Sequence, residues 1–96
     1  MEKAHVYWFF GLSGSGKSTL ADALAVYLKV TGEPILRLDG DQLRTGLNKD
    51  LGFSSEDRLE NVRRAAEIAK LSLVQGISVV ASFITPEEIL RHNPFM

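Results

Sequence analysis

Cysteine is absent from this 96-residue chain, which excludes disulfides, thiolate metal sites and a cysteine nucleophile. An excess of charge of one sign is also lacking, because 11 basic and 12 acidic residues give a formal net charge of −1. The sequence therefore offers no overall electrostatic attraction to nucleic acid or to an anionic membrane, and we expect neither as a partner. Histidine is scarce, and His5 and His92 lie too far apart in the sequence to suggest a metal-binding cluster.

Long hydrophobic runs are missing as well. The longest apolar run near the N-terminus, residues 6–10, is too short to span a membrane, and Glu2 argues against a signal peptide. We therefore expect a cytoplasmic protein. The length and the 45% hydrophobic content indicate one small domain over 1–96, whose stability would be marginal unless the protein is longer or oligomeric.

The most informative stretch that is present is GLSGSGKS at 11–18, a complete match to the phosphate-binding pattern G-x-x-x-x-G-K-[ST]. Its glycines let backbone N–H groups point at an anion, while Lys17 supplies a positive charge and Ser18 a hydroxyl for Mg²⁺. The helix that begins here turns its positive dipole end toward the same anion. The residues expected to bind ATP are Gly11, Leu12, Ser13, Gly14, Ser15, Gly16, Lys17, Ser18 and Thr19.

The segments on either side favour this interpretation over an ordinary Gly/Ser-rich turn. Residues 5–10 form a short aromatic and β-branched run that is typical of a buried strand. Leucine and alanine then recur at helical spacing over 17–31, before Gly32 and Pro34 end the helix. A strand before the loop and a helix after it are the context that the motif requires.

The remaining segments complete an α/β pattern. We predict a strand over 35–39, a brief helix over 42–47, a long helix from Ser54 to about Gly76 and a strand over 77–84. Because strand–helix–strand units of this length form right-handed crossovers, the predicted fold is a parallel sheet of about three strands with flanking helices. The apolar stripe predicted for the long helix consists of Leu59, Val62, Ala66, Ala69 and Leu73.

Polar motifs follow each predicted strand, namely GLSGSGKS, DGDQLR and SFITP. Since the carboxyl ends of parallel strands lie along one edge of the sheet, these motifs are expected to meet there. Within DGDQLR, one carboxylate could serve a metal ion and the other, Asp41, could act as a base or orienting acceptor for a hydroxyl. The alternative is that Asp39-Gly40-Asp41 is a turn that caps the next helix.

Donors to an anionic acceptor could come from Arg44, Arg58 and Asn61. The alternative is a solvated face in which these side chains pair with the acidic residues Glu56, Asp57 and Glu60. Phe53 could belong to the core or could stack on a base. Three further basic residues lie away from the expected crevice, and for them we favour a solvated face: Arg63, Arg64 and Lys70.

Three stretches together resemble the adenylylsulfate kinase (APS kinase) family: GLSGSGKSTLA at 11–21, LDGDQLRTGLNKDLGFSSEDRLENVRRAAEIAKL at 38–71 and SFITP at 82–86. The resemblance implies a P-loop NTPase-type kinase domain and covers residues 5 to about 86. It implies transfer of the γ-phosphoryl group of ATP to the 3′-hydroxyl of adenosine 5′-phosphosulfate in sulfate assimilation, with Mg²⁺ as cofactor. Because family members are roughly twice as long, the chain would correspond to the N-terminal half of that domain.

The resemblance also implies residue roles. Lys17 would serve ATP, Ser18 and Asp39 would hold Mg²⁺, and Lys17, Asp41 and Thr85 would be catalytic. The residues implied to hold the adenylylsulfate are Asp41, Arg44, Phe53, Arg58, Asn61, Ile84 and Thr85.

The sequence departs from the family at several positions. Gln42 stands where the family usually has Asn, Thr85 stands where it has Ser, and Glu87 and Glu88 follow Pro86. Because phosphoryl transfer works mainly by positioning, we expect direct in-line transfer with Thr85 as an auxiliary hydroxyl. A second interpretation is a catalytically incomplete nucleotide-binding fragment, either truncated, without the lid and C-terminal half, or paired with a complementary chain. As a protein partner we expect a second copy in a homodimer or the missing C-terminal half. A third, another small-molecule P-loop kinase, is disfavoured by the stretch from DGD to ENVRR.

Overall fold

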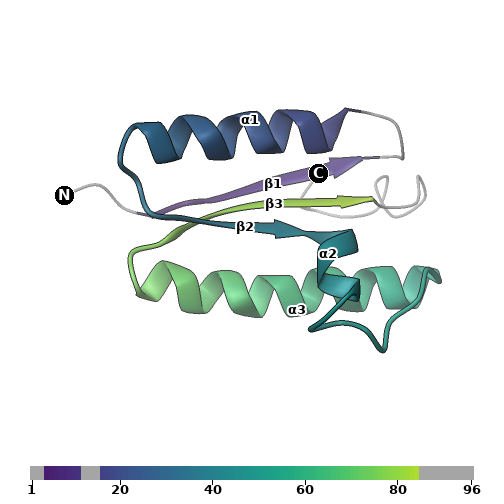
Figure 1. The fold of residues 1–96 in the computed structure, drawn as a ribbon. Helices are drawn as coiled ribbons and strands as arrows, with labels where there is room; N and C mark the ends of the chain where they lie inside the picture. Colours follow the sequence, from purple (N-terminus) through teal and green to yellow (C-terminus); the bar gives the residue numbers. More distant parts are fainter. Residues whose placement is uncertain (1–3, 12–15, 85–96) are drawn as a thin grey trace.

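A computed structural model of the chain describes residues 4–11 and 16–84. A three-stranded parallel sheet lies between helices on its two faces, which gives three layers (Figure 1). This confirms the predicted α/β fold class. The elements in chain order are β1 (Val6–Gly11), α1 (Lys17–Val30), β2 (Ile35–Asp39), α2 (Gly40–Arg44), α3 (Ser55–Val74) and β3 (Ser78–Ile84).

The last strand, β3, lies in the middle of the sheet, in the order β1-β3-β2. The register pairs Gly11 with Ile84 and Asp39 with Ser82, so all three strands end at the same edge. Six of the seven β3 residues are buried, because strands and helices surround this strand on every side. Its near-continuous run of apolar and small residues is what a fully buried parallel strand needs.

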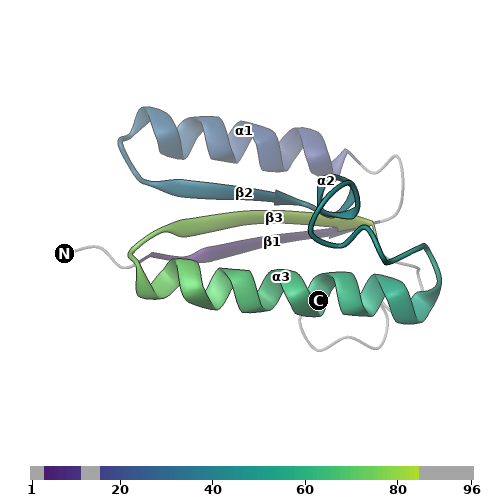
Figure 2. The same ribbon diagram turned by 60° about the horizontal axis from the view of Figure 1, so that its bottom comes forward.

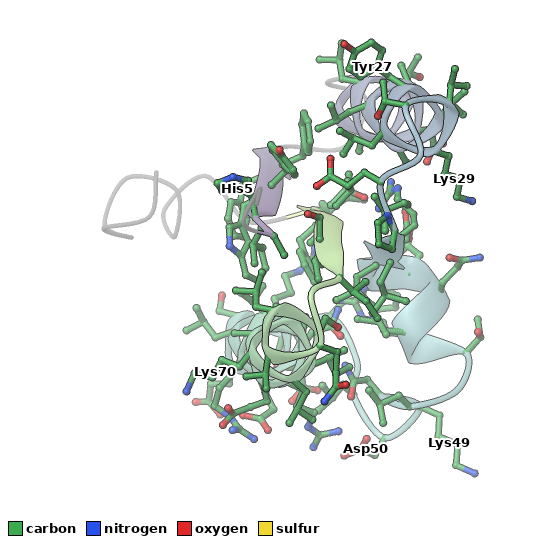
Figure 3. All side chains as sticks on the ribbon, turned by 90° about the vertical axis from the view of Figure 1, so that its left-hand side faces the viewer. His5, Tyr27, Lys29, Lys49, Asp50 and Lys70 are labelled. Atoms are coloured by element: carbon green, nitrogen blue, oxygen red, sulfur yellow. The ribbon has the colours of Figure 1, made fainter. Side chains whose placement is uncertain are left out.

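Helices α1 and α3 lie on opposite faces of the sheet (Figure 2). Alternation along the strands divides the core into two clusters, one under each of these helices. Val79, Ala81 and Phe83 pack with Ala65 and Ala69 on the α3 face. Val80 of the same strand faces the other way and packs against α1, whose buried residues are Ala21, Ala25 and Leu28. Tyr27 lies on the outer side of α1, and Lys70 extends from the flank of α3 on the side of the sheet where β1 lies (Figure 3).

The predicted apolar stripe of α3 is only partly confirmed, since Ala69 is buried and Val62 packs against the core while other members are more exposed. Leu59 is 47% exposed, and the residues that α3 buries are Asn61, Ala65, Ala69 and Ser72. Two of these four residues are polar, and each is satisfied by hydrogen bonding: the Asn61 amide contacts other segments, and Ser72 Oγ donates to the carbonyl of Ile68 at 3.0 Å. A search for apolar periodicity cannot find a buried face that is half polar.

The predicted helix over 42–47 is displaced, because α2 begins at Gly40 and ends at Arg44. The other elements agree with the prediction to within one or two residues. Ser54 caps α3 as predicted, with its Oγ accepting from the backbone N–H of Asp57 at 3.1 Å. In the part of the chain that the structure describes, no helix is both long enough and apolar enough to cross a bilayer.

Candidate functional site

The phosphate-binding motif has the structural context that it requires. β1 ends at Gly11, and α1 begins at Lys17 with Gly16 as the residue before its first turn. Gly16 has a φ of 81°, a left-handed conformation that favours glycine. The motif residues Leu12, Ser13, Gly14 and Ser15 lie outside the described residues, as does Thr85.

Asp39, at the end of β2, does cap the next helix, as the turn interpretation predicted. Its Oδ1 accepts hydrogen bonds from the backbone N–H groups of Asp41 at 2.9 Å and Gln42 at 3.2 Å. Its Oδ2 accepts from the Ser82 hydroxyl at 3.3 Å. Since an ionised carboxylate has about four lone-pair sites, these contacts leave acceptor capacity on a group that is 25% exposed.

Asp41 differs from Asp39 in being open to solvent, with 67% of its side chain exposed. Its Oδ1 forms an ion pair with Arg44 Nη1 at 3.2 Å, one helical turn along. The two aspartates therefore have different environments: one carboxylate is tied to the protein and the other is accessible. An accessible carboxylate beside an arginine is suited to accepting a hydrogen bond from a bound hydroxyl.

Phe53 is an exposed ring flanked by two cations. The ring is 65% exposed, so it is not a core residue. The guanidinium carbons of Arg44 and Arg58 lie 4.6 Å and 5.5 Å from its centroid, within the range of cation–π attraction. We call Arg44, Phe53 and Arg58 the aromatic–arginine cluster.

Backbone carbonyls hold both arginines of this cluster in place. Arg44 Nε donates to the carbonyl of Gly52 at 3.1 Å, and its side chain is 10% exposed. Arg58 donates to the carbonyl of Phe53 at 2.9 Å and to that of Ile84, the last residue of β3, at 3.1 Å. The Ile84 contact brings the cluster to the edge at which the strands end. A guanidinium has five N–H donors, so these contacts leave capacity for an anionic ligand.

Asn61 is not part of that exposed cluster. It is 1% exposed and lies beneath α2, where its Nδ2 donates to the carbonyl of Gly40 at 3.3 Å. Its Oδ1 accepts from Asn48 Nδ2 at 2.6 Å. Through these contacts the Asn61 amide holds α2 against α3.

The hydrogen-bond network behind Asn61 leaves no periodic pattern in the sequence by which it could be predicted. Asn48 is fully buried, and its Oδ1 accepts from Arg64 Nη1 at 3.2 Å. Arg64 also reaches Asp50 at 2.8 Å, in the loop before α3 (Figure 3), and Glu60 at 2.9 Å. Hydrogen bonds from Arg64 lower the pKa of Asp50, and those from Arg63 and Arg64 lower the pKa of Glu60 to about 2. Arg64 therefore stiffens the loop that carries Asn48.

The donor set at this edge fits Mg²⁺ held jointly with a nucleotide. Among residues 4–11 and 16–84, no group of three or more His, Cys, Asp or Glu side chains could hold a metal ion by itself. Mg²⁺ in kinases is usually bound by one or two protein oxygens together with phosphates and water. The Asp39 carboxylate, at the end of β2, is one oxygen donor of the kind that such a site needs.

Comparison with known proteins gives matches along almost the whole chain. The protein-family model described as adenylylsulphate kinase matches residues 3–94. An adenylyl-sulfate kinase of Bacillus licheniformis is 56% identical over 84 residues, which cover 88% of this chain and 43% of that protein. An adenylyl-sulfate kinase of Paraburkholderia xenovorans is 57% identical over 88 residues, covering 92% of this chain and 48% of that protein. The chain thus spans a little under half the length of these relatives.

A solved structure shows the same arrangement of elements. The APS kinase of Mycobacterium tuberculosis, in complex with AMPPNP and APS, superposes with a TM-score of 0.74 at 46% sequence identity. The match covers 82% of this chain and 45% of that chain.

Proposed function

The chain belongs to the adenylylsulphate kinase family, and from this we propose that it provides the nucleotide side and the acceptor side of an ATP-dependent adenylylsulfate kinase. The enzyme would transfer the γ-phosphoryl group of ATP to the 3′-hydroxyl of adenosine 5′-phosphosulfate and form 3′-phosphoadenylyl sulfate. The observation that carries the proposal is the aromatic–arginine cluster, which lies at the same sheet edge as the phosphate-binding motif.

The acceptor side follows from the chemistry of that cluster. An adenine ring can stack on the exposed face of Phe53, and base–aromatic stacking is worth about 1–3 kcal/mol. The guanidinium groups of Arg44 and Arg58 can then donate to the phosphosulfate of the same ligand. The Ile84 carbonyl fixes Arg58, and Asn61 supports the α2 end of the pocket.

Asp41 would accept the proton of the attacking hydroxyl or orient that hydroxyl for attack. It is the exposed carboxylate of the pair and lies next to Arg44, which the proposal assigns to the acceptor. Because phosphoryl transfer depends on positioning and charge stabilisation, alignment of the hydroxyl by Asp41 is the main contribution we assign to it. Thr85 would be an auxiliary hydroxyl in a direct in-line transfer.

On the nucleotide side, the backbone of residues 11–19 would surround the phosphates, and Lys17 would neutralise the outer ones. Ser18 and Asp39 would hold Mg²⁺. When bound, the ion would supply positive charge that offsets the charge developing on the phosphate oxygens. The placement of Asp39 at the end of β2, on the same sheet face as α1, supports this role.

The first test is an acceptor-binding measurement. With Phe53→Ala, we expect the affinity for adenosine 5′-phosphosulfate to fall about tenfold or more in calorimetric titration, because the stacking surface is lost. The affinity for ADP should not change. Leu47→Ala is the matched control, since Leu47 is a large apolar side chain with a similar exposure of 60%. Equal affinity of the Phe53→Ala and unsubstituted chains for the acceptor would contradict the proposed pocket.

The second test is turnover, measured as 3′-phosphoadenylyl sulfate formed by the chain with ATP, Mg²⁺ and adenosine 5′-phosphosulfate. Formation of that product supports the proposed kinase activity. Preferential phosphorylation of a different hydroxyl acceptor would contradict the proposed substrate.

A second candidate function is nucleotide binding without catalysis. It is favoured by one observation: the matched relatives are more than twice as long as the part that this chain matches. A chain that binds ADP and adenosine 5′-phosphosulfate yet forms no product in the turnover test would have this function. Closure of a lid over both nucleotides excludes water, so its loss should reduce turnover far more than it reduces binding.

A further inference from the structure

Arg37 is a charged residue in the middle of β2, a strand that is otherwise apolar up to its last residue. Its side chain is 17% exposed, which is unusual for an arginine. Because alternate residues of a strand share one face, Arg37 lies on the same face as Asp39. That face is covered by α1, since Arg37 Nε donates to Asp22 of α1 at 2.9 Å.

The guanidinium of Arg37 is held in one orientation by contacts in several directions. Besides Asp22, it donates from Nη1 to the carbonyl of Leu38 at 2.6 Å. From Nη2 it donates to the hydroxyl of Ser82 on β3 at 2.8 Å. Three elements, α1, β2 and β3, therefore fix where this charge lies.

The contact with Arg37 determines where the hydrogen of the Ser82 hydroxyl points. A guanidinium can only donate, so Ser82 Oγ accepts from Arg37 and its own hydrogen is left to point elsewhere. The nearest recorded acceptor is Asp39 Oδ2, at 3.3 Å. The hydrogen bonds thus run in one sense, from Arg37 through Ser82 to Asp39.

Asp39 is held from two sides as a result. Its Oδ1 caps α2 by accepting from Asp41 and Gln42, and its Oδ2 receives the Ser82 hydroxyl on the face that α1 covers. Ser82 is 2% exposed, so this contact is shielded from competing water. The Asp39 carboxylate therefore connects α2, which carries Asp41, to Ser82 on the face of the sheet that α1 covers.

We propose that Arg37 is a positioning residue, which acts through Ser82 to hold Asp39 in the orientation that receives the nucleotide-bound divalent cation. This inference rests on the proposed function, because it assumes a magnesium nucleotide at the edge of the sheet. Hydrogen-bonding partners of a metal-binding carboxylate commonly change metal affinity about 10- to 100-fold when they are removed.

An opposite effect of Arg37 must be weighed against this one. Arg37 Nη2 lies 3.8 Å from Asp39 Oδ2, and a positive charge at that distance repels a cation at the same carboxylate. Asp22, paired with the other side of the guanidinium, offsets part of this repulsion. If repulsion dominated, removal of Arg37 would strengthen metal binding, whereas loss of positioning weakens it. The sign of the change therefore separates the two effects.

The experiment measures ADP affinity by calorimetry, once in EDTA and once with Mn²⁺, together with the electron paramagnetic resonance signal of bound Mn²⁺. The variants are Arg37→Met, which removes the charge at similar length, and Ser82→Ala, which keeps the charge and removes the intermediate hydroxyl. We expect the gain in ADP affinity on adding Mn²⁺ to fall about tenfold in both variants, with the EDTA affinity unchanged. The control is Lys29→Met, which removes one positive charge from an exposed position in the last turn of α1. This variant should keep the full gain in ADP affinity on adding Mn²⁺.

An equal or larger Mn²⁺-dependent gain in Arg37→Met would overturn the inference. If Arg37→Met fails to fold, as judged by circular dichroism, Ser82→Ala decides the question, because a serine-to-alanine change leaves the packing of β3 almost intact. Failure of the unsubstituted chain to bind ADP in either buffer would overturn the proposed function and this inference with it. ADP binding with an unaltered Mn²⁺-dependent gain in both variants would overturn this inference alone.

Discussion

Glu60 lies between two arginines on the surface of α3, Arg63 and Arg64, and we expect this arrangement to make the stability of the fold depend on pH in acid. Arg63 donates to both carboxylate oxygens at 2.8 and 2.7 Å, and Arg64 donates at 2.9 Å. These hydrogen bonds lower the pKa of Glu60 from 4.5 to about 2. Because the folded-state pKa is the lower one, the stabilisation is present above about pH 4.5 and is lost as the pH falls toward 2.

We therefore expect Glu60→Gln to flatten the decline in the free energy of unfolding between about pH 5 and pH 2, measured by urea denaturation at a series of pH values. In about 1 M salt the difference between the two proteins should shrink, because exposed ion pairs are screened. Parallel acid profiles at low salt would contradict the prediction.

At this scale the sequence revealed the charged residues of the site more readily than their partners. The position and chemistry of Asp41, Arg44, Phe53 and Arg58 point to an anionic acceptor, the family resemblance implies the same role, and the structure brings them together. Asn48 could not be selected, because its importance depends on burial and on three segments that meet only in the folded chain. Arg37 did give a signal, as a charge inside an apolar strand, but its partners on α1 and β3 are distant in sequence.

Among the elements, α2 shows how closely a short helix can be fitted against a strand and a longer helix. A Cβ added at Gly40 would lie 2.8 Å from Phe83 Cδ1 and 3.3 Å from Asn61 Nδ2. Both neighbours are buried and hold α2 in place. We expect Gly40→Ala to lower the free energy of unfolding by roughly 1–3 kcal/mol in urea denaturation, because the core around Phe83 must shift.

Gly46→Ala is the matched control for that substitution. A Cβ at Gly46 would meet none of the described atoms within 4 Å, and its φ is not in the left-handed region. The change should be neutral or should stabilise by a few tenths of a kcal/mol to about 1 kcal/mol, since alanine reduces the freedom of the unfolded chain. Equal losses of stability in the two variants would mean that the close contacts at Gly40 are not the cause.

The existence and order of the elements could be predicted because strands and helices leave periodic signals in the sequence. The start of α2 at Gly40 follows from the cap that Asp39 forms with Oδ1, which was only the alternative interpretation of Asp39-Gly40-Asp41, whereas the pattern within residues 42–47 places the helix too late. The polar half of the buried face of α3 could not be predicted either: Asn61 bonds to Asn48 and Gly40 outside the helix, and Ser72 bonds to the carbonyl of Ile68 within it, and neither contact leaves an apolar signal.

At the scale of the whole molecule, β1 is an edge strand, and among the described residues no strand pairs with its outer side. A cavity of about 210 Å³ opens between this edge strand and α3. It is lined by Val6, Trp8, Phe10, Val62, Ala66, Ala69, Lys70 and Leu73. Four members of the predicted apolar stripe of α3 thus line this cavity, and two of them, Val62 and Ala69, also contribute to the core under α3.

Ala66→Leu should partly fill the cavity and raise the free energy of unfolding by roughly 0.5–2 kcal/mol in urea denaturation. Ala23→Leu makes the same chemical change at an exposed position of α1 and should have an effect within about 0.5 kcal/mol. An Ala66→Leu protein that is less stable than the control would show that the space is not available to a larger side chain.

The central position of β3 also has a consequence for how the chain is made. β1 and β2 are synthesised first, yet each pairs with β3 and neither pairs with the other. The contact between His5 and Ser78 joins residues 73 positions apart. On a ribosome, α1 can form as soon as it emerges, because its hydrogen bonds are local, but both early strands must remain unpaired until the last strand emerges. The native pairing of the described strands therefore cannot form before β3 has been synthesised.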